Sequence, residues 1–483
     1  MNSKLSDHKF KKGKFVTPMN DALSDIGKKN YWDKERLPEY LWIGLIIKYY
    51  GRKDGLIKCG YIIQKLIELF PDINLPKLSK ILKLDNEEQA KFYDFVLEYV
   101  DKDVLAPLTL IVTYSKYKSF ALKFNNDLSV KNRIDKINDT LEDANFHQSY
   151  LSTDIRFIIL YCNLLAGKLN VPGEILEKLL SYPDLEHDNE KMREIRPSVR
   201  SMEQAMVSLE EHDLEYLKLF WDGVSKLNDC ELMYIEYSEE ELDTTKYIEK
   251  VKNILSYYTD LLTASNPLDN KMLVLLGIVT YSYKRLQELV NHKLYNTISG
   301  RSIVRVLVED YIMMKYLLKN EAFHKDIWLE YQYYGIGQYK LIVERYLQSG
   351  EELKENHVQF KYMNLLIDEY TNREFIDMDT KYFNKEGVRE KAISVDEKEL
   401  FDYYYDYDSA FEHGLWGAIR ESSLLKCSSP AHQYHCIPDV ENLQKMTSVL
   451  SDCIKLMNKT INFLNGIYGI PAHLKLEEDI DGN

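Results

Sequence analysis

The stretch R-S-I-V-R-V-L-V-E-D-Y-I-M-M-K-Y-L-L-K, residues 301–319, decides the class of fold for this chain. Apolar residues cover most sides of the helix that its periodicity predicts, and a helix of this kind is buried among other helices. Arg301, Arg305 and Glu309 recur every four residues, so they share one face of that helix. Charge inside a protein is costly unless it is paired. We therefore expect either a solvated stripe with a weak Arg–Glu pair or a polar pocket that Arg305 and Glu309 face.

A second strongly apolar stretch, R-L-P-E-Y-L-W-I-G-L-I-I-K-Y-Y at residues 36–50, predicts a buried helix in the first half of the chain. Pro38 suits the first turn of that helix, where a missing N–H costs little. Residues 229–237, D-C-E-L-M-Y-I-E-Y, are the one short stretch compatible with a strand, and no strand–helix alternation indicates a doubly wound sheet. Further helices are predicted at 59–70, 87–100, 104–118, 151–168, 173–182, 203–228, 239–263, 268–293, 322–348, 351–370, 397–426 and 439–466.

These patterns predict an all-α protein with two domains, which suits a chain of 483 residues. We expect a mobile N-terminal arm over residues 1–30 and an irregular helical domain over residues 31–235. A bundle of long helices over residues 236–483 then carries the candidate site.

The composition excludes several classes of protein. A net charge of −15 argues against a general coat for DNA or RNA, whose phosphates are bound by Lys and Arg, although a local basic pocket stays open. No stretch has the length of a membrane span or the apolar core of a signal peptide, and the six scattered cysteines form no disulfide framework. Gly-rich nucleotide-binding motifs do not occur, so no cofactor is expected. We predict a soluble cytoplasmic protein with reduced thiols.

The densest run of site-type residues lies between positions 409 and 436. On the helix predicted there, Ser409, His413, Trp416 and Arg420 fall at i, i+4, i+7 and i+11, which aligns them along one face. His413 has the chemistry of a general acid or base, and Arg420 would hold a phosphate or a carboxylate. The structural alternative is a packed histidine with Trp416 filling the core. The predicted catalytic residues are His413, Arg305, Glu309 and Arg420.

Cys427, His432, His435 and Cys436 place four side chains of the types that bind zinc within ten residues. Adjacent His435 and Cys436 do not easily point at one ion, and no second pair is visible elsewhere. The favoured interpretation is a structured loop, stiffened by Pro430, in which a histidine caps the preceding helix. No metal is therefore assigned, and a zinc cluster stays the alternative.

Three motifs together resemble a family of uncharacterised bacterial helical proteins, a domain of unknown function. The resemblance extends over residues 240–440, and L-P-E-Y-L-W at 37–42 is similar to the start of longer members. It implies an all-helical domain and little about activity. The motifs are R-x-x-x-E (Arg305, Glu309), S-x-x-x-H-G-x-W (Ser409, His413, Gly414, Trp416) and C-x-x-P-x-H-x-x-H (Cys427, Pro430, His432, His435).

A weaker resemblance is to HEPN-type proteins, helical bundles that often cleave RNA and act as toxins or antiviral effectors. In that chemistry a histidine moves protons to and from the 2′-OH or the leaving oxygen, and an arginine stabilises developing negative charge. The HEPN pattern places the arginine four to six residues before the histidine, whereas here Arg420 follows His413.

We therefore expect a helical effector of a bacterial defence or stress system that cleaves RNA with His413 and an arginine. The alternative is a non-catalytic sensor or adaptor subunit that binds a protein partner or forms a homo-oligomer. A third hypothesis is a metal-dependent hydrolase built on residues 427–436.

Overall fold

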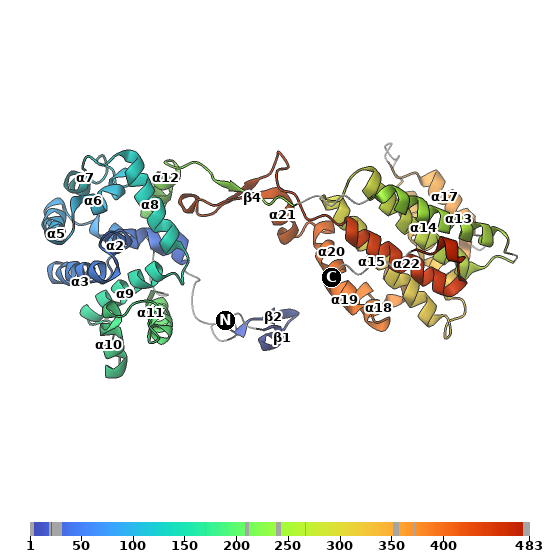
Figure 1. Cartoon of the computed structure of the whole chain (residues 1–483), viewed down its shortest axis with the longest axis horizontal. Coiled ribbons are helices and arrows are strands. Elements are labelled where there is room, and N and C mark those ends of the chain that lie inside the picture. Colours follow the sequence, from blue (N-terminus) through green and yellow to red (C-terminus); the bar gives the residue numbers. More distant parts are fainter. Residues whose placement is uncertain are drawn as a thin grey trace. The chain divides into compact units, whose positions relative to one another are not determined.

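The structure is a computed structural model, and it is almost entirely helical, as Figure 1 shows. Helices account for 69% of it and strands for 3%, which confirms the predicted all-α class. Among the described residues, no helix combines the length and apolar character needed to cross a membrane. The described residues are 4–18, 21, 31–169, 171–207, 212–237, 243–265, 267–350, 357–370 and 373–476.

The chain divides into two compact units that interrupt each other in sequence. Unit 1 is Met1–Met233 together with Lys426–Cys436, and unit 2 is Tyr234–Leu425 together with Ile437–Asn483. An eleven-residue segment near the end of the chain therefore folds with the first unit.

Unit 1 is built around α2 (Leu37–Tyr50), whose residues from Leu37 to Ile47 are all buried. It packs against α3 (Arg52–Leu69), α8 (Val130–Asn145) and α9 (Tyr150–Leu165). Pro38 lies in the first turn, as predicted. The other helices of unit 1 are η2 (Trp32–Arg36), α4 (Leu78–Ile81), α5 (Asn86–Tyr99), α6 (Lys102–Leu105), η3 (Ala106–Leu110), α7 (Lys118–Phe124), α10 (Gly173–Leu180), η4 (Tyr182–Asp184), α11 (Met192–Val207) and α12 (Leu214–Ser225).

Part of the predicted N-terminal arm is ordered as a short turn, η1 (Leu5–Asp7), and a hairpin of β1 (Lys9–Lys11) and β2 (Lys14–Val16). Lys12 and Gly13 both have positive φ, 48° and 76°, which is the backbone of a tight two-residue hairpin turn. The remainder of the arm, residues 1–3, 19–20 and 22–30, lies outside the described residues.

A buried ion cluster joins the first and last helices of unit 1. Arg36 and Glu203 form a salt bridge, and Arg156 Nε lies 3.6 Å from the same carboxylate. All three side chains are at most 4% exposed. Both guanidinium groups also lie over the Trp32 ring. Glu203 is therefore the one carboxylate within this cluster that compensates two buried arginines.

Unit 2 is a bundle of long helices around α15 (Ile298–Asn320), which contains the stretch quoted above. Its neighbours include α14 (Asn270–Asn291), α20 (Asp406–Glu412) and α22 (Leu450–Tyr468). The burial of this mostly apolar helix is confirmed. The other elements of unit 2 are α13 (Thr244–Thr263), α16 (Ile327–Ser349), α17 (Phe360–Asp368), η5 (Arg373–Phe375), η6 (Phe383–Lys385), α18 (Val388–Ser394), α19 (Lys398–Leu400), η7 (Phe401–Tyr405), α21 (Trp416–Ser423) and η9 (Ala472–Leu474).

The single helix predicted over residues 397–426 is wrong. α20 ends at His413, because Gly414 adopts the left-handed conformation with φ 57°. Leu415 N–H donates to the Ala410 carbonyl and Gly414 N–H to that of Phe411, the Schellman pattern that ends helices at glycine. α21 starts afresh at Trp416, so Ser409 and His413 do not share a continuous helix face with Trp416 and Arg420.

Three short strands carry the chain through residues 232–233 and 424–438. β3 (Leu232–Met233) pairs antiparallel with β4 (Leu424–Cys427), and β5 (Cys436–Pro438) follows in the same sheet. β3 lies in the one stretch that the sequence marked as compatible with a strand. Between β4 and β5 lies the turn η8 (Pro430–His432), which packs on α8 and α12 with Ala431 in the unit 1 core.

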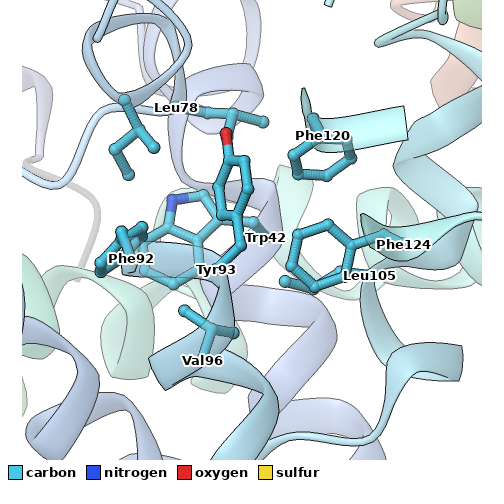
Figure 2. Close-up of a pocket in the computed structure, with 9 residues that line it drawn as sticks. Trp42, Leu78, Phe92, Tyr93, Val96, Leu105, Phe120 and Phe124 are labelled. Carbon is cyan, nitrogen blue, oxygen red and sulfur yellow. The ribbon is translucent and has the colours of Figure 1, made fainter. Parts of the chain in front are cut away.

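The two best-defined cavities, both in unit 1, are poor sites for acid–base chemistry. The one in Figure 2 is a void of ≈10 Å³ among Trp42, Tyr93, Phe120 and other apolar side chains. It is no more than a packing gap, since a buried water needs about that volume and also polar partners. A larger cavity of ≈240 Å³ beside Tyr61 and Tyr161 is lined by no Asp, Glu, His, Lys or Arg.

We predict that Glu203→Gln destabilises unit 1 by about 3–5 kcal/mol, because it leaves two buried arginines without compensation. The measurement is urea unfolding followed by the fluorescence of the protein. Glu194→Gln on the same helix is the matched control, since its partner Lys178 and Glu194 are 62% and 78% exposed. That change should move the unfolding free energy by less than about 0.5 kcal/mol. Equal effects of the two substitutions would contradict the prediction.

Candidate functional site

Arg305 is the centre of a hydrogen-bonded network on α15. Its Nε donates to Ser409 Oγ at 3.1 Å, and its Nη2 donates to the Tyr405 hydroxyl at 2.7 Å. Its Nη1 lies 3.4 Å from Glu309 Oε2, one helical turn further along α15. The guanidinium also lies over the Tyr405 ring, 4.7 Å from its centroid. Each of the three guanidinium nitrogens therefore has a partner.

Glu309 is held in the same network. Tyr382 donates to one carboxylate oxygen, and Tyr405 donates to the other at 3.4 Å. Burial first, and then the Glu309 charge, raises the pKa of Tyr405 to about 12 and raises that of Tyr382 further. Both tyrosines therefore stay protonated and serve as donors. The side chains of Arg305 and Glu309 are only 21% and 22% exposed, so the stripe is a half-buried network and not a solvated ion pair.

The turn between α20 and α21 presents His413 and Trp416 to solvent. His413 is the C-cap of α20 and is exposed, and within the described chain its ring has no hydrogen-bond partner. Trp416 is 70% exposed at the first position of α21. The alternative of a packed histidine with a core tryptophan is therefore wrong. Below the turn, Phe411 and Ala418 form a small core with Met446.

The other predicted arginine, Arg420, lies on α21 and is partly exposed. Its Nη1 donates to the Leu424 carbonyl at 2.9 Å, at the end of the same helix. Of the four residues predicted to be catalytic, Arg305 and Glu309 thus contact each other, and Ser409 joins them from α20. His413 and Arg420 belong to the following turn and helix and are not bonded to that network.

A buried carboxylate lies under the turn. Asp408 and Arg301 are each 3% exposed. Burial raises the pKa of Asp408 to about 7, with Asp452 and Glu421 acting in the same direction and Arg301 opposing them. This group was not singled out in the sequence, because nothing in D-Y-D-S distinguishes a buried aspartate from an exposed one.

Four metal-binding side chains converge in unit 1. The ligand atoms of Cys230, Cys427, His432 and His435 all lie within 4.8 Å of one another. Cys427 is fully buried, whereas Cys230 and His435 are at the surface. His432 also donates or accepts at the carbonyls of Ser225 and Asn228, 3.0 and 3.2 Å away, at the C-terminal end of α12. A histidine of this loop does contact a helix end, but it is α12 and not the preceding helix.

The sequence placed the wrong cysteine in this group. Cys436 was the fourth residue of the predicted cluster, yet it is exposed and lies outside the group. The reason is geometric: His435 and Cys436 are neighbours in an extended segment, so their side chains point to opposite sides. Cys230 takes the fourth position, although it is 202 residues from His432 in sequence. No local spacing marks Cys230, so only the pairing of β3 with β4 reveals it.

The fold and these two polar clusters define an all-helical protein with a Cys/His group in one unit and an exposed His/Trp turn in the other. Residues 272–432, a third of the chain, match the model of a family described as a family of unknown function, DUF5677. This confirms the expected similarity to an uncharacterised domain family. The matched region contains Arg305, Glu309 and His413. No curated protein and no solved structure matches the chain.

We predict that Asp408→Asn changes the pH dependence of folding. A carboxyl with a pKa near 7 in the folded state and about 4 in the unfolded state stabilises the fold below about pH 4 and loses that contribution as the pH rises to 7. An amide cannot ionise. The variant should therefore be more stable than the wild type by about 1–3 kcal/mol near pH 8 and equal to it near pH 4. Urea unfolding at both pH values measures this, and a difference that does not change with pH would contradict it.

Proposed function

We propose that the protein is a helical adaptor subunit that binds a protein partner through the α20–α21 turn. The observation that carries this proposal is the exposure of Trp416, 70%, beside Leu415 at 56% and Ile419 at 37%. Tyr407, 44% exposed, donates to Glu421 at 2.6 Å and so lies beside α21. We call Tyr407, Leu415, Trp416 and Ile419 the aromatic face.

A tryptophan that is mostly in water at the start of a helix is expensive to leave uncovered. Burying a side chain of this size contributes several kcal/mol in protein–protein interfaces, where tryptophan and tyrosine dominate the energetic hot spots. Single exposed apolar residues are ordinary on protein surfaces, whereas four large ones around one turn favour a contact surface.

The network below the turn supports this role by holding the aromatic face in one conformation. Arg305 bonds Ser409 in the last turn of α20, and Ser302 of α15 donates to Glu412. The Schellman turn at Gly414 then fixes the start of α21. A surface that is ordered before binding loses less conformational entropy when the partner arrives. Arg305 and Glu309 thus act as positioning residues, and their occupied donors suit this role better than the direct capture of a phosphate.

Charge around the aromatic face indicates the chemistry of the partner. Glu412 and Glu421 are exposed on the two helices that carry it, and the chain as a whole has a net charge of −15. Complementary charge at the rim of an interface accelerates association and excludes wrong partners. The partner should therefore offer an apolar pocket for the indole, rimmed by lysine or arginine.

We predict that Trp416→Asp abolishes partner binding, with a loss of affinity of about thirtyfold or more. The tagged full chain is used to recover partners from a lysate of its own cells, and the affinity of a partner so identified is then measured with purified proteins. Phe323→Asp is the matched control, because Phe323 is 92% exposed in unit 2 and lies away from the aromatic face in sequence. A partner that binds the wild type and the Trp416→Asp variant equally would contradict the proposal.

Cleavage of RNA, as an effector of a bacterial defence or stress system, is the second candidate, and the free ring of His413 favours it. The imidazole would take the proton of a 2′-OH while the new 2′-O–P bond forms and the P–O5′ bond breaks, leaving a 2′,3′-cyclic phosphate. The leaving 5′-oxygen would receive a proton from water or from the imidazolium. Arg420 would face the phosphate with the nitrogens that do not bond Leu424.

This candidate predicts that His413→Ala protects RNA. Purified wild type should convert single-stranded RNA to fragments with cyclic phosphate ends, and the variant should lose at least about 100-fold in rate. His292→Ala is the matched control, because His292 is also an exposed helix C-cap in unit 2. RNA that remains intact with the wild type, or is cleaved equally by the His413→Ala variant, would reject a catalytic role for His413.

A further inference from the structure

We propose that Cys230, Cys427, His432 and His435 together bind one zinc ion in a closed four-ligand site. This site differs from the aromatic face in position, since all four residues belong to unit 1. Its role would be to fasten the segment that contains residues 427–435 to the end of α12.

The separations of the donor atoms suit a tetrahedral ion. Cys230 Sγ lies 3.2 Å from His432 Nδ1 and 3.2 Å from His435 Nε2, and Cys427 Sγ lies 3.6 Å from His432 Nδ1. Zinc–sulfur bonds of about 2.3 Å and zinc–nitrogen bonds of about 2.0–2.1 Å at tetrahedral angles place sulfur and nitrogen about 3.6 Å apart. The observed distances therefore need only small adjustments to accept the ion.

The hydrogen bonds of His432 present the correct nitrogen to the metal. Its Nε2 lies 3.0 Å from the Ser225 carbonyl and 3.2 Å from that of Asn228. Carbonyl oxygens only accept, so Nε2 must carry the proton. In the neutral ring Nδ1 is then unprotonated, and its lone pair points at both thiols. A backbone carbonyl behind a ligating histidine is the usual way in which proteins orient a metal ligand.

The backbone brings the two halves of the site together. Ser428 N–H donates to the Glu231 carbonyl at 2.8 Å, and Cys427 N–H donates to the His435 carbonyl at 2.9 Å. The first bond sets Cys230 beside Cys427, and the second returns His435 to the same place.

The turn between the two histidines is unusual. Gln433 and Tyr434 both have positive φ, 53° and 50°, although neither is glycine. Such backbone is uncommon for residues with a side chain and persists only where other contacts enforce it. Here it brings the two imidazole rings to 5.0 Å between centroids. The strain is thus located where it aligns two ligands.

The residue types select zinc and a structural role. Two thiolates with two imidazoles are a common ligand set for structural zinc, and they suit hard ions such as magnesium or calcium poorly. A catalytic zinc keeps one position for water, whereas this set supplies four protein ligands. The geometry therefore favours a structural ion over the metal-dependent hydrolase considered from the sequence.

The test is the zinc content of the full chain, purified without chelators and measured by elemental mass spectrometry. We expect about one zinc per wild-type chain and at least a tenfold loss in Cys230→Ser and in His435→Ala. Cys436→Ser is the matched control, because Cys436 is an exposed free cysteine of the same segment outside the group, and it should keep the full content. No zinc in the wild type after addition of zinc, or equal zinc in Cys230→Ser, would overturn the proposal.

A second measurement covers misfolding of the variants and the possibility of a Cys230–Cys427 disulfide. Cobalt(II) added to the metal-free wild type and to Cys436→Ser should give equal thiolate-to-cobalt charge-transfer bands. Alkylation of the unfolded, unreduced wild type should modify all six cysteines. Absence of the charge-transfer band, or two cysteines blocked as a disulfide, would overturn the zinc site without reliance on any variant.

Discussion

The return of residues 426–436 to unit 1 is the constraint on which the rest of the structure depends. Backbone bonds between Ser428 and Glu231, together with the burial of Ala431 in the unit 1 core, hold this segment in place. Its first residues end β4, directly after α21, so the end of the α20–α21 region is tied to a fixed strand. The same return assembles the Cys/His group from residues far apart in sequence.

Two polar clusters follow from this fold, and they differ in what they leave unsatisfied. On α15 the charges are satisfied internally: Arg305 has partners at all three nitrogens, and Glu309 accepts from two tyrosines. That cluster positions its neighbours. In the Cys/His group, by contrast, two thiols face the same imidazole nitrogen, which a cation satisfies better than a single proton does. The first cluster therefore supports a surface and the second supports a metal.

The sequence predicted the fold class because periodicity reports burial directly. The apolar stretches at 36–50 and 301–319 are the central helices of the two units, and Arg305 does meet a partner from the S-x-x-x-H-G-x-W motif. The break at Gly414 was readable, since a glycine after a polar helix end is a stop signal, but the apolar pattern of 415–419 hid it. Cys230 was not readable, because strand pairing over a long separation leaves no local spacing.

The account's central claim is that residues 427–435 are held by a zinc ion shared with Cys230. X-ray absorption at the zinc edge of the purified wild-type chain tests it most directly. We predict a first shell of two sulfurs at about 2.3 Å and two nitrogens at about 2.0–2.1 Å, with imidazole scattering beyond it. A shell of oxygens, or one with no sulfur, would contradict the account.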